Sequence, residues 1–282
     1  HFPITHHPQM NITFIGGGNM ASAIIVGLLA KKFAAEALRV MDVDARARSR
    51  VEHKYPGVRC YDEAHKAMRD GDVIVLAVKP QQMREAVSRL GVTGNNTNLI
   101  ISIAAGITLA SLGRWLGGYT RLVRAMPNTP ALIGAGDTGL YAIPLHISEA
   151  DRLHAEAILG AVGATVWISD ADKMDAVTAV SGSGPAYVFY FMEALEQAAK
   201  ELGLAQETAR KLALHTFTGA AKLADSSADP AAVLRERVTS KGGTTEAALR
   251  SMAGDHVKEA IIRAVKAAHE RGRELGADLG KD

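Results

Sequence analysis

The sequence predicts an α/β domain followed by an all-α domain. From about residue 10 to about residue 170, short apolar runs typical of buried strands alternate with helical patterns. After residue 170 the strand-like runs stop and helical patterns continue to the end. A chain of 282 residues is long enough for two folding units of roughly 100–200 residues each. We therefore expect one domain at 10–170 and another at 171–282.

The first nine residues follow neither pattern. Residues 1–9 contain three of the ten histidines, and Met10 opens the first strand-like run. We expect this segment to be a leader or the remnant of an expression tag, so it does not enter the fold prediction.

The N-terminal part contains five strand candidates. They are Asn11–Ile15, Leu38–Asp42, Asp72–Val78, Leu99–Ala104 and Arg121–Met126. Because helical patterns separate these runs, and because the runs are almost continuously apolar, we expect a parallel, doubly wound sheet covered on both faces. Two later runs, 138–143 and 164–168, are candidates to extend the sheet.

The C-terminal part reads as a series of helices. Pro185 suits the first turn of a long helix over 185–202, and Gly203 suits its C-terminal cap. Further helical patterns cover 206–224, 230–238, 245–252 and 256–275.

Composition excludes several classes of protein. The net charge is +2, from 32 basic and 30 acidic residues, which argues against a general nucleic-acid-binding surface. Cys60 is the only cysteine, so an internal disulfide framework and a multi-cysteine metal centre are both excluded. No run approaches the ~18 apolar residues that span a membrane. We expect a cytoplasmic protein without a metal, nucleic-acid or membrane partner.

A glycine-rich turn lies between the first strand and an apolar helical run. It reads Gly16-Gly17-Gly18-Asn19-Met20-Ala21, with the G-x-G-x-x-A spacing of dinucleotide-binding turns. Glycines there permit a tight turn and close approach of the backbone, so a pyrophosphate can bind free N–H groups at the helix N-terminus. We expect all six residues to contact the cofactor of a Rossmann-type domain. The alternative is an ordinary glycine-rich turn.

The second strand ends on an acidic residue that bears on cofactor choice. Asp42 is placed to accept hydrogen bonds from the adenine-ribose hydroxyls, which favours NADH. Arg46, Arg48 and Arg50 follow closely, and a guanidinium there would favour the 2′-phosphate of NADPH unless these residues only form a solvated helix face. The sequence leaves NADPH and NADH both open.

Three further loops end strands at the same edge of the predicted sheet, where ligands bind in such folds. The expected cofactor contacts are Ala77, Val78, Lys79, Pro80, Ala104, Ala105, Gly106 and Asn128. Small residues let a flat ring approach the backbone, and the proline-rich run 126–130 makes a rigid loop with polar side chains.

Two loops of the helical part are candidates for the substrate. Residues 181–187 lead into the long helix, where the glycines would equally serve close helix packing. Residues 238–245 precede another helix and offer N–H groups, hydroxyls and a helix dipole to an anion such as a carboxylate. The alternative is a plain N-cap by Thr244 or Thr245, with Glu246 in the first turn.

These motifs together resemble the pyrroline-5-carboxylate reductase family. The resemblance runs from Met10 to the C-terminal region and is most specific at 14–21, 77–80, 124–130, 181–187 and 240–245. One departure is Lys241, where many members carry proline. The family implies hydride transfer from NADPH or NADH to the C=N carbon of 1-pyrroline-5-carboxylate, giving L-proline.

The resemblance also implies roles for individual residues. Thr245 is the hydroxyl nearest the ring nitrogen and the candidate catalytic group, and Thr178 borders the nicotinamide. The substrate carboxylate is held by Ser240, Gly242, Gly243 and Thr244, and Thr245 completes the substrate-binding residues. Family members dimerise by interlocking their helical domains, and some form a larger ring of dimers, so we expect the second domain to be a dimerisation domain.

Two other functions fit parts of the pattern. A β-hydroxyacid dehydrogenase has the same order of domains but carries a catalytic lysine in the long helix, whereas Lys200 lies near the end of that helix here. A non-catalytic dinucleotide sensor would not need the loop at 240–245.

Overall fold

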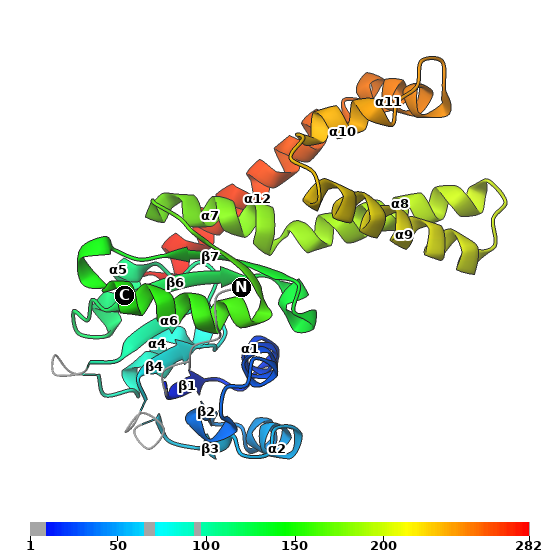
Figure 1. Cartoon of the computed structure of the whole chain (residues 1–282). Coiled ribbons are helices and arrows are strands. Elements are labelled where there is room, and N and C mark those ends of the chain that lie inside the picture. Colours follow the sequence, from blue (N-terminus) through cyan, green and yellow to red (C-terminus); the bar gives the residue numbers. More distant parts are fainter. Residues whose placement is uncertain (1–9, 65–70, 93–96, 282) are drawn as a thin grey trace. The chain divides into compact units, whose positions relative to one another are not determined.

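The computed structural model describes residues 10–64, 71–92 and 97–281, so the expected leader at 1–9 lies outside the described residues. The chain divides into two compact units (Figure 1). The first contains the described residues up to Ser183 and those from Ala268 on, and the second is Gly184–Ala267. The expected boundary was 170/171. The first unit extends further because the segment after residue 170 packs on the sheet, as does the end of the chain.

The first unit is built on one eight-stranded sheet, in the order β3-β2-β1-β4-β5-β6-β7-β8. The strands are β1 (Ile12–Ile15), β2 (Leu38–Met41), β3 (Arg59–Tyr61), β4 (Val73–Leu76), β5 (Leu99–Ser102), β6 (Leu122–Pro127), β7 (Gly136–Tyr141) and β8 (Gly163–Trp167). All seven predicted strands are present. The three-residue edge strand β3 was not predicted, because it is too short to show a period.

The sheet is parallel except at one pair. Strand β7 runs antiparallel to β6 and parallel to β8. A parallel crossover needs a dozen or more residues, and only residues 128–135 connect β6 to β7. The five strands that were expected to form a parallel sheet do run parallel. The reversal comes at β7, the first of the two candidate extensions, where the short connection from β6 allows no crossover.

Helices cover both faces of the sheet. They are α1 (Asn19–Ala30), α2 (Ala45–Lys54), α4 (Met83–Ser88), α5 (Leu109–Trp115), α6 (Glu149–Leu159), α7 (Met174–Val177) and the end of α12 (Val257–Leu279). Successive residues of a strand point to opposite faces. Phe14 accordingly belongs to a buried cluster with Ile24 of α1, whereas Ile15 belongs to a second cluster with Leu112 of α5 and, at its margin, Leu279 of α12. The doubly wound arrangement is confirmed.

The second unit is entirely helical. It contains α8 (Gly184–Glu201), α9 (Gln206–Asp225), α10 (Ala231–Arg237), α11 (Thr244–Gly254) and the first part of α12. Pro185 lies in the first turn of α8 as predicted, and Gly203 follows that helix with a left-handed φ of 91°. No helix in the described part of the chain is both long enough and apolar enough to cross a membrane.

Candidate functional site

The glycine turn after β1 contains two glycines with different surroundings: Gly16 is packed against the protein backbone, and the space beside Gly18 is empty. Gly16 has a φ of 100°, and a Cβ there would lie 2.9 Å from the carbonyl oxygen of Ala77. Its N–H donates to the carbonyl of Met41 at 2.7 Å. Gly18 is the N-cap of α1 without a side-chain cap, and no atom lies within 4 Å of where its Cβ would stand. The backbone around Gly18 is therefore open to a ligand at the positive end of α1.

A cleft of about 230 Å³ opens beside this turn. Six predicted cofactor residues line it: Gly16, Gly18, Asp42, Ala77, Val78 and Lys79. The sequence reasoning missed seven more: Ile15, Met41, Val43, Gln82, Glu85, Ala86 and Arg89. The last four of these have the i, i+3, i+4, i+7 spacing of one helix face, which was the signal available after Pro80.

Asp42 fixes the shape of the turn. One carboxylate oxygen accepts from the Gly17 N–H at 2.8 Å and the other from the Asp44 N–H at 2.9 Å. Arg48 donates to the Asp42 carbonyl at 2.7 Å. Arg50 lines a separate cavity of about 340 Å³ together with Gly17 and Asn19. Asp42 thus faces the cleft while bracing the backbone around it, and Arg48 is bound to the loop.

Other predicted cofactor residues have roles inside the fold. Ala21 is fully buried, and Met20 packs against the same core cluster. Ala104 is also buried. Pro80 begins the short 3-10 turn that precedes α4. The backbone of Gly106 is approached closely by Gly276 of α12.

Asn128 binds the segment that begins at Thr178, and neither residue is among those that line the cleft. The Asn128 amide nitrogen donates to the Ser181 carbonyl at 3.2 Å, and its oxygen accepts from the Asp137 N–H at 2.9 Å. Thr178 begins a π-helical turn, Thr178–Gly182, and its hydroxyl donates to the Met174 carbonyl at 3.0 Å. Turns of this type are frequent at functional sites, and residue periodicity gave no sign of this one.

A buried ion pair holds the same segment to the sheet. Arg124 of β6 is 4% exposed, and its guanidinium lies 2.9 Å from the carboxylate of Asp175 on α7. A Cβ on Gly182 would lie 2.6 Å from the methyl carbon of Met126. Strand β6 and the loop after it therefore contact the segment 175–182 through three residues: Arg124, Met126 and Asn128.

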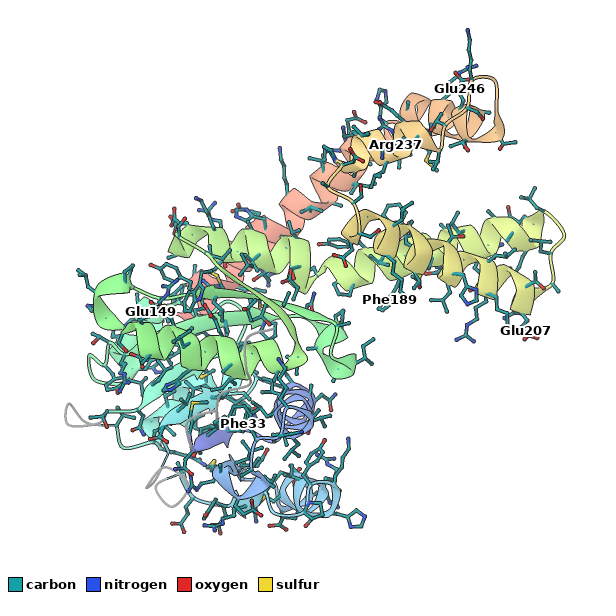
Figure 2. The ribbon with its side chains drawn as sticks, viewed as in Figure 1. Phe33, Glu149, Phe189, Glu207, Arg237 and Glu246 are labelled. Atoms are coloured by element: carbon teal, nitrogen blue, oxygen red, sulfur yellow. The ribbon has the colours of Figure 1, made fainter. Side chains whose placement is uncertain are left out.

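The candidate substrate loop lies in the second unit, before α11. Gly243 is the N-cap of α11 and has no side-chain cap, so Thr244 and Thr245 are the first two residues of the helix, not its cap. The Gly243 N–H donates to the Ser240 carbonyl at 3.0 Å. Figure 2 shows Glu246 at this end of α11, and its carboxylate accepts from the Gly242 N–H at 2.6 Å. A carboxylate of the chain itself thus occupies part of the expected anion site.

The described residues offer little other chemistry. They contain no group of three or more His, Cys, Asp or Glu residues that could hold a metal ion. Burial raises the pKa of the Cys60 thiol to about 11, and the nearby Glu52 carboxylate adds to the shift. The thiol is therefore protonated near neutral pH and is a poor nucleophile.

Comparison with known proteins identifies both parts of the chain. Residues 11–106 match the family model described as "NADP oxidoreductase coenzyme F420-dependent", and residues 171–275 match "Pyrroline-5-carboxylate reductase dimerisation". A pyrroline-5-carboxylate reductase of Pseudomonas aeruginosa is 44% identical over 270 residues, covering 96% of this chain and 98% of that protein.

Two solved structures are similar over almost the whole chain. The pyrroline-5-carboxylate reductase of Coxiella burnetii is 41% identical with a TM-score of 0.89, covering 95% of this chain and 98% of that one. The Plasmodium falciparum pyrroline carboxylate reductase, solved with NADP bound, is 28% identical with a TM-score of 0.83 at the same coverage. With an NAD(P)-binding α/β unit and a matching dimerisation domain, the chain belongs to the pyrroline-5-carboxylate reductase family.

Proposed function

We propose that this chain reduces the C=N bond of 1-pyrroline-5-carboxylate with hydride from NADPH or NADH, giving L-proline. The observation that carries the proposal within this chain is the open glycine turn. The Gly18 backbone and the uncapped start of α1 border a cleft, and no protein atom fills the place of a Cβ at Gly18. A pyrophosphate fits this position, because backbone N–H groups and the helix dipole favour an anion there.

The residues at the carboxyl ends of β1, β2 and β4 would hold the cofactor. Gly16, Gly18, Asp42 and the loop 77–79 line the cleft. When bound, the cofactor supplies the hydride. The chain supplies position, because holding two reactants in a productive geometry accounts for much of the acceleration of such a transfer.

The loop before α11 would hold the substrate. Backbone N–H groups at Gly242, Gly243 and Thr244, with the Ser240 hydroxyl, are the proposed donors to the carboxylate of the imino acid. Before substrate binds, the Gly242 N–H donates to Glu246 and the Gly243 N–H to the Ser240 carbonyl, so the substrate has to compete with these two bonds. The Thr245 hydroxyl would orient the ring nitrogen. An imine takes up a proton from solvent readily near neutral pH, so the nitrogen arrives as an iminium and needs only a hydrogen-bonding group beside it, not a strong catalytic acid.

The same proposal covers assembly and location. We expect a homodimer formed by the second unit, which the matched dimerisation family supports. A larger ring of dimers and a cytoplasmic location are further expectations. Light scattering of the purified enzyme distinguishes a dimer from a ring by mass.

Steady-state kinetics tests the function. The purified chain is assayed with 1-pyrroline-5-carboxylate and either NADPH or NADH, and 3-hydroxy acids with the oxidised cofactors serve as the control. We expect turnover with the imine and none with 3-hydroxy acids. The ratio of kcat/KM with NADPH to kcat/KM with NADH defines cofactor preference. Oxidation of 3-hydroxy acids would favour the dehydrogenase alternative, and cofactor binding without any turnover would favour a sensor.

A further inference from the structure

The end of helix α12 packs on the loop that follows β5. Both belong to the first unit, although α12 begins in the second. A Cβ on Gly276 would lie 2.9 Å from the carbonyl oxygen of Gly106, and a Cβ on Gly106 would lie 3.5 Å from the Gly276 nitrogen. Gly106 has a φ of 76°. The two backbones therefore touch, and only glycine at 276 leaves the Gly106 carbonyl where it is.

Other contacts keep this end of the helix in place. The Arg114 guanidinium donates to the Gly280 carbonyl at 2.6 Å. Leu279 packs against the buried cluster that contains Ala104, Ile107 and Leu112. The loop 104–107 is thus held on one side by its own apolar residues in the sheet core and on the other by α12. The dimerisation family model ends at residue 275, just before Gly276.

We propose that Gly276 is a positioning residue, which fixes the backbone of the loop 104–106 where the nicotinamide ring is to lie. The inference rests on the proposed function, and on the expectation from the sequence that Ala104, Ala105 and Gly106, at the carboxyl end of β5, border the cofactor. Gly276 touches no reactant itself. It sets the place of the Gly106 carbonyl, and a shift of this loop displaces the ring relative to the imine carbon.

The same helix offers a matched pair of variants. Gly276→Ala places a methyl group 2.9 Å from a backbone oxygen, a distance that forces the loop to move. Gly272→Ala, one turn earlier, places its methyl group 3.8 Å from the Asp175 Cβ, which is an ordinary contact. Both replace glycine by alanine inside α12, so they change helix propensity equally.

Three kinds of measurement, namely hydrogen exchange, NADPH binding and steady-state kinetics, separate positioning from general damage. In the enzyme without cofactor, we expect Gly276→Ala to speed hydrogen exchange in the segment 103–109. NADPH should still bind at full stoichiometry, because the glycine turn is unchanged. kcat should fall about tenfold for a displacement of a few tenths of an ångström, and the isotope effect with NADPH deuterated at the transferred position should rise. Gly272→Ala should match the wild type in all three.

The outcomes are decisive in either direction. Wild-type exchange, kcat and isotope effect in Gly276→Ala would overturn the proposal, and so would a fall in kcat explained by fewer NADPH-binding sites. If Gly276→Ala does not fold, the same measurements are made on Arg114→Gln. This variant removes the hydrogen bond to the Gly280 carbonyl and so loosens the end of α12 without adding atoms. A wild-type enzyme with no imine reduction would instead refute the proposed function.

Discussion

At the scale of single residues, the glycines of the cofactor turn differ in what surrounds them. Gly16 is enclosed by the backbone of Ala77 and adopts a left-handed φ, whereas the space beside Gly18 is empty. The two glycines of the G-x-G motif therefore have different roles: Gly16 serves the fold, and Gly18 serves cofactor binding. Mutation separates them.

Gly18→Val should keep the fold and lose the cofactor. The side chain enters open space, so the cost in unfolding free energy should stay below about 1 kcal/mol, as for an apolar residue at an N-cap. It blocks the approach of the pyrophosphate, and the Kd for NADPH should rise at least tenfold, or about 1.4 kcal/mol. Calorimetric titration and thermal unfolding measure both. Gly16→Ala is the contrasting variant, expected to lose roughly 1–3 kcal/mol of stability. Wild-type affinity in Gly18→Val would contradict the assignment.

Thr245→Ala tests the proposed orienting hydroxyl. The variant should fold normally, because Thr245 is the second residue of α11 and does not cap it. Loss of one hydrogen bond in the transition state should lower kcat/KM by roughly 1–3 kcal/mol. Thr245→Ser retains a hydroxyl and should recover most of the activity. Unchanged kcat and KM in Thr245→Ala would remove this residue from the mechanism.

Replacing Glu246, unlike replacing Thr245, is expected to improve the enzyme, by strengthening substrate binding. The Glu246 carboxylate occupies the Gly242 N–H that the substrate carboxylate is expected to use, and it brings a negative charge to the same loop. Glu246→Gln removes the charge and keeps an acceptor for the Gly242 N–H, so weaker repulsion of the substrate carboxylate should lower the KM for 1-pyrroline-5-carboxylate about fivefold, or ~1 kcal/mol. The KM for NADPH is the internal control. A higher substrate KM would mean that Glu246 supports the loop more than it competes.

At the scale of elements, the features that could be predicted from the sequence are those that a local residue pattern encodes. Buried strands and long helices were found from their apolar periods, and Pro185 and Gly203 marked the ends of α8. The reversal at β7, the π-helical turn at Thr178–Gly182 and the return of α12 to the first unit depend on contacts distant in sequence. No local period encodes them. The seven missed lining residues of the cleft are a different case, because four of them do follow one helix period after Pro80: Gln82, Glu85, Ala86 and Arg89.

The Arg124–Asp175 pair makes the strongest prediction about how elements are joined. Arg124 is almost fully buried, so Asp175→Asn leaves a cation without its partner and should cost roughly 3–5 kcal/mol of stability. The exposed pair Arg271–Glu274 on α12 is the control, where Glu274→Gln should cost no more than about 0.5 kcal/mol. Thermal unfolding at one protein concentration compares the two. Equal, small losses would show that the buried pair does not hold α7 to β6.

At the scale of the whole molecule, the second unit lacks a core of its own. All of residues 184–267 are described, and among them only Ala209 and Ala213 are buried. Large apolar side chains are exposed instead, among them Phe189, labelled in Figure 2, at 62% and Tyr190 at 71%. Helices with so little buried surface are not stable alone. A partner must cover them, and the match to a dimerisation domain identifies a second copy as that partner.

Phe189→Glu should therefore impair both assembly and folding of this unit. Burial of a phenylalanine contributes about 2 kcal/mol, and a charge in its place adds a desolvation cost. We expect sedimentation to show monomers, and the melting temperature to fall and to lose the concentration dependence expected of a dimer. Leu145→Glu is the matched control, because Leu145 is 94% exposed in the first unit. If Phe189→Glu remained a dimer of wild-type stability, the interface would have to lie on other helices of the second unit.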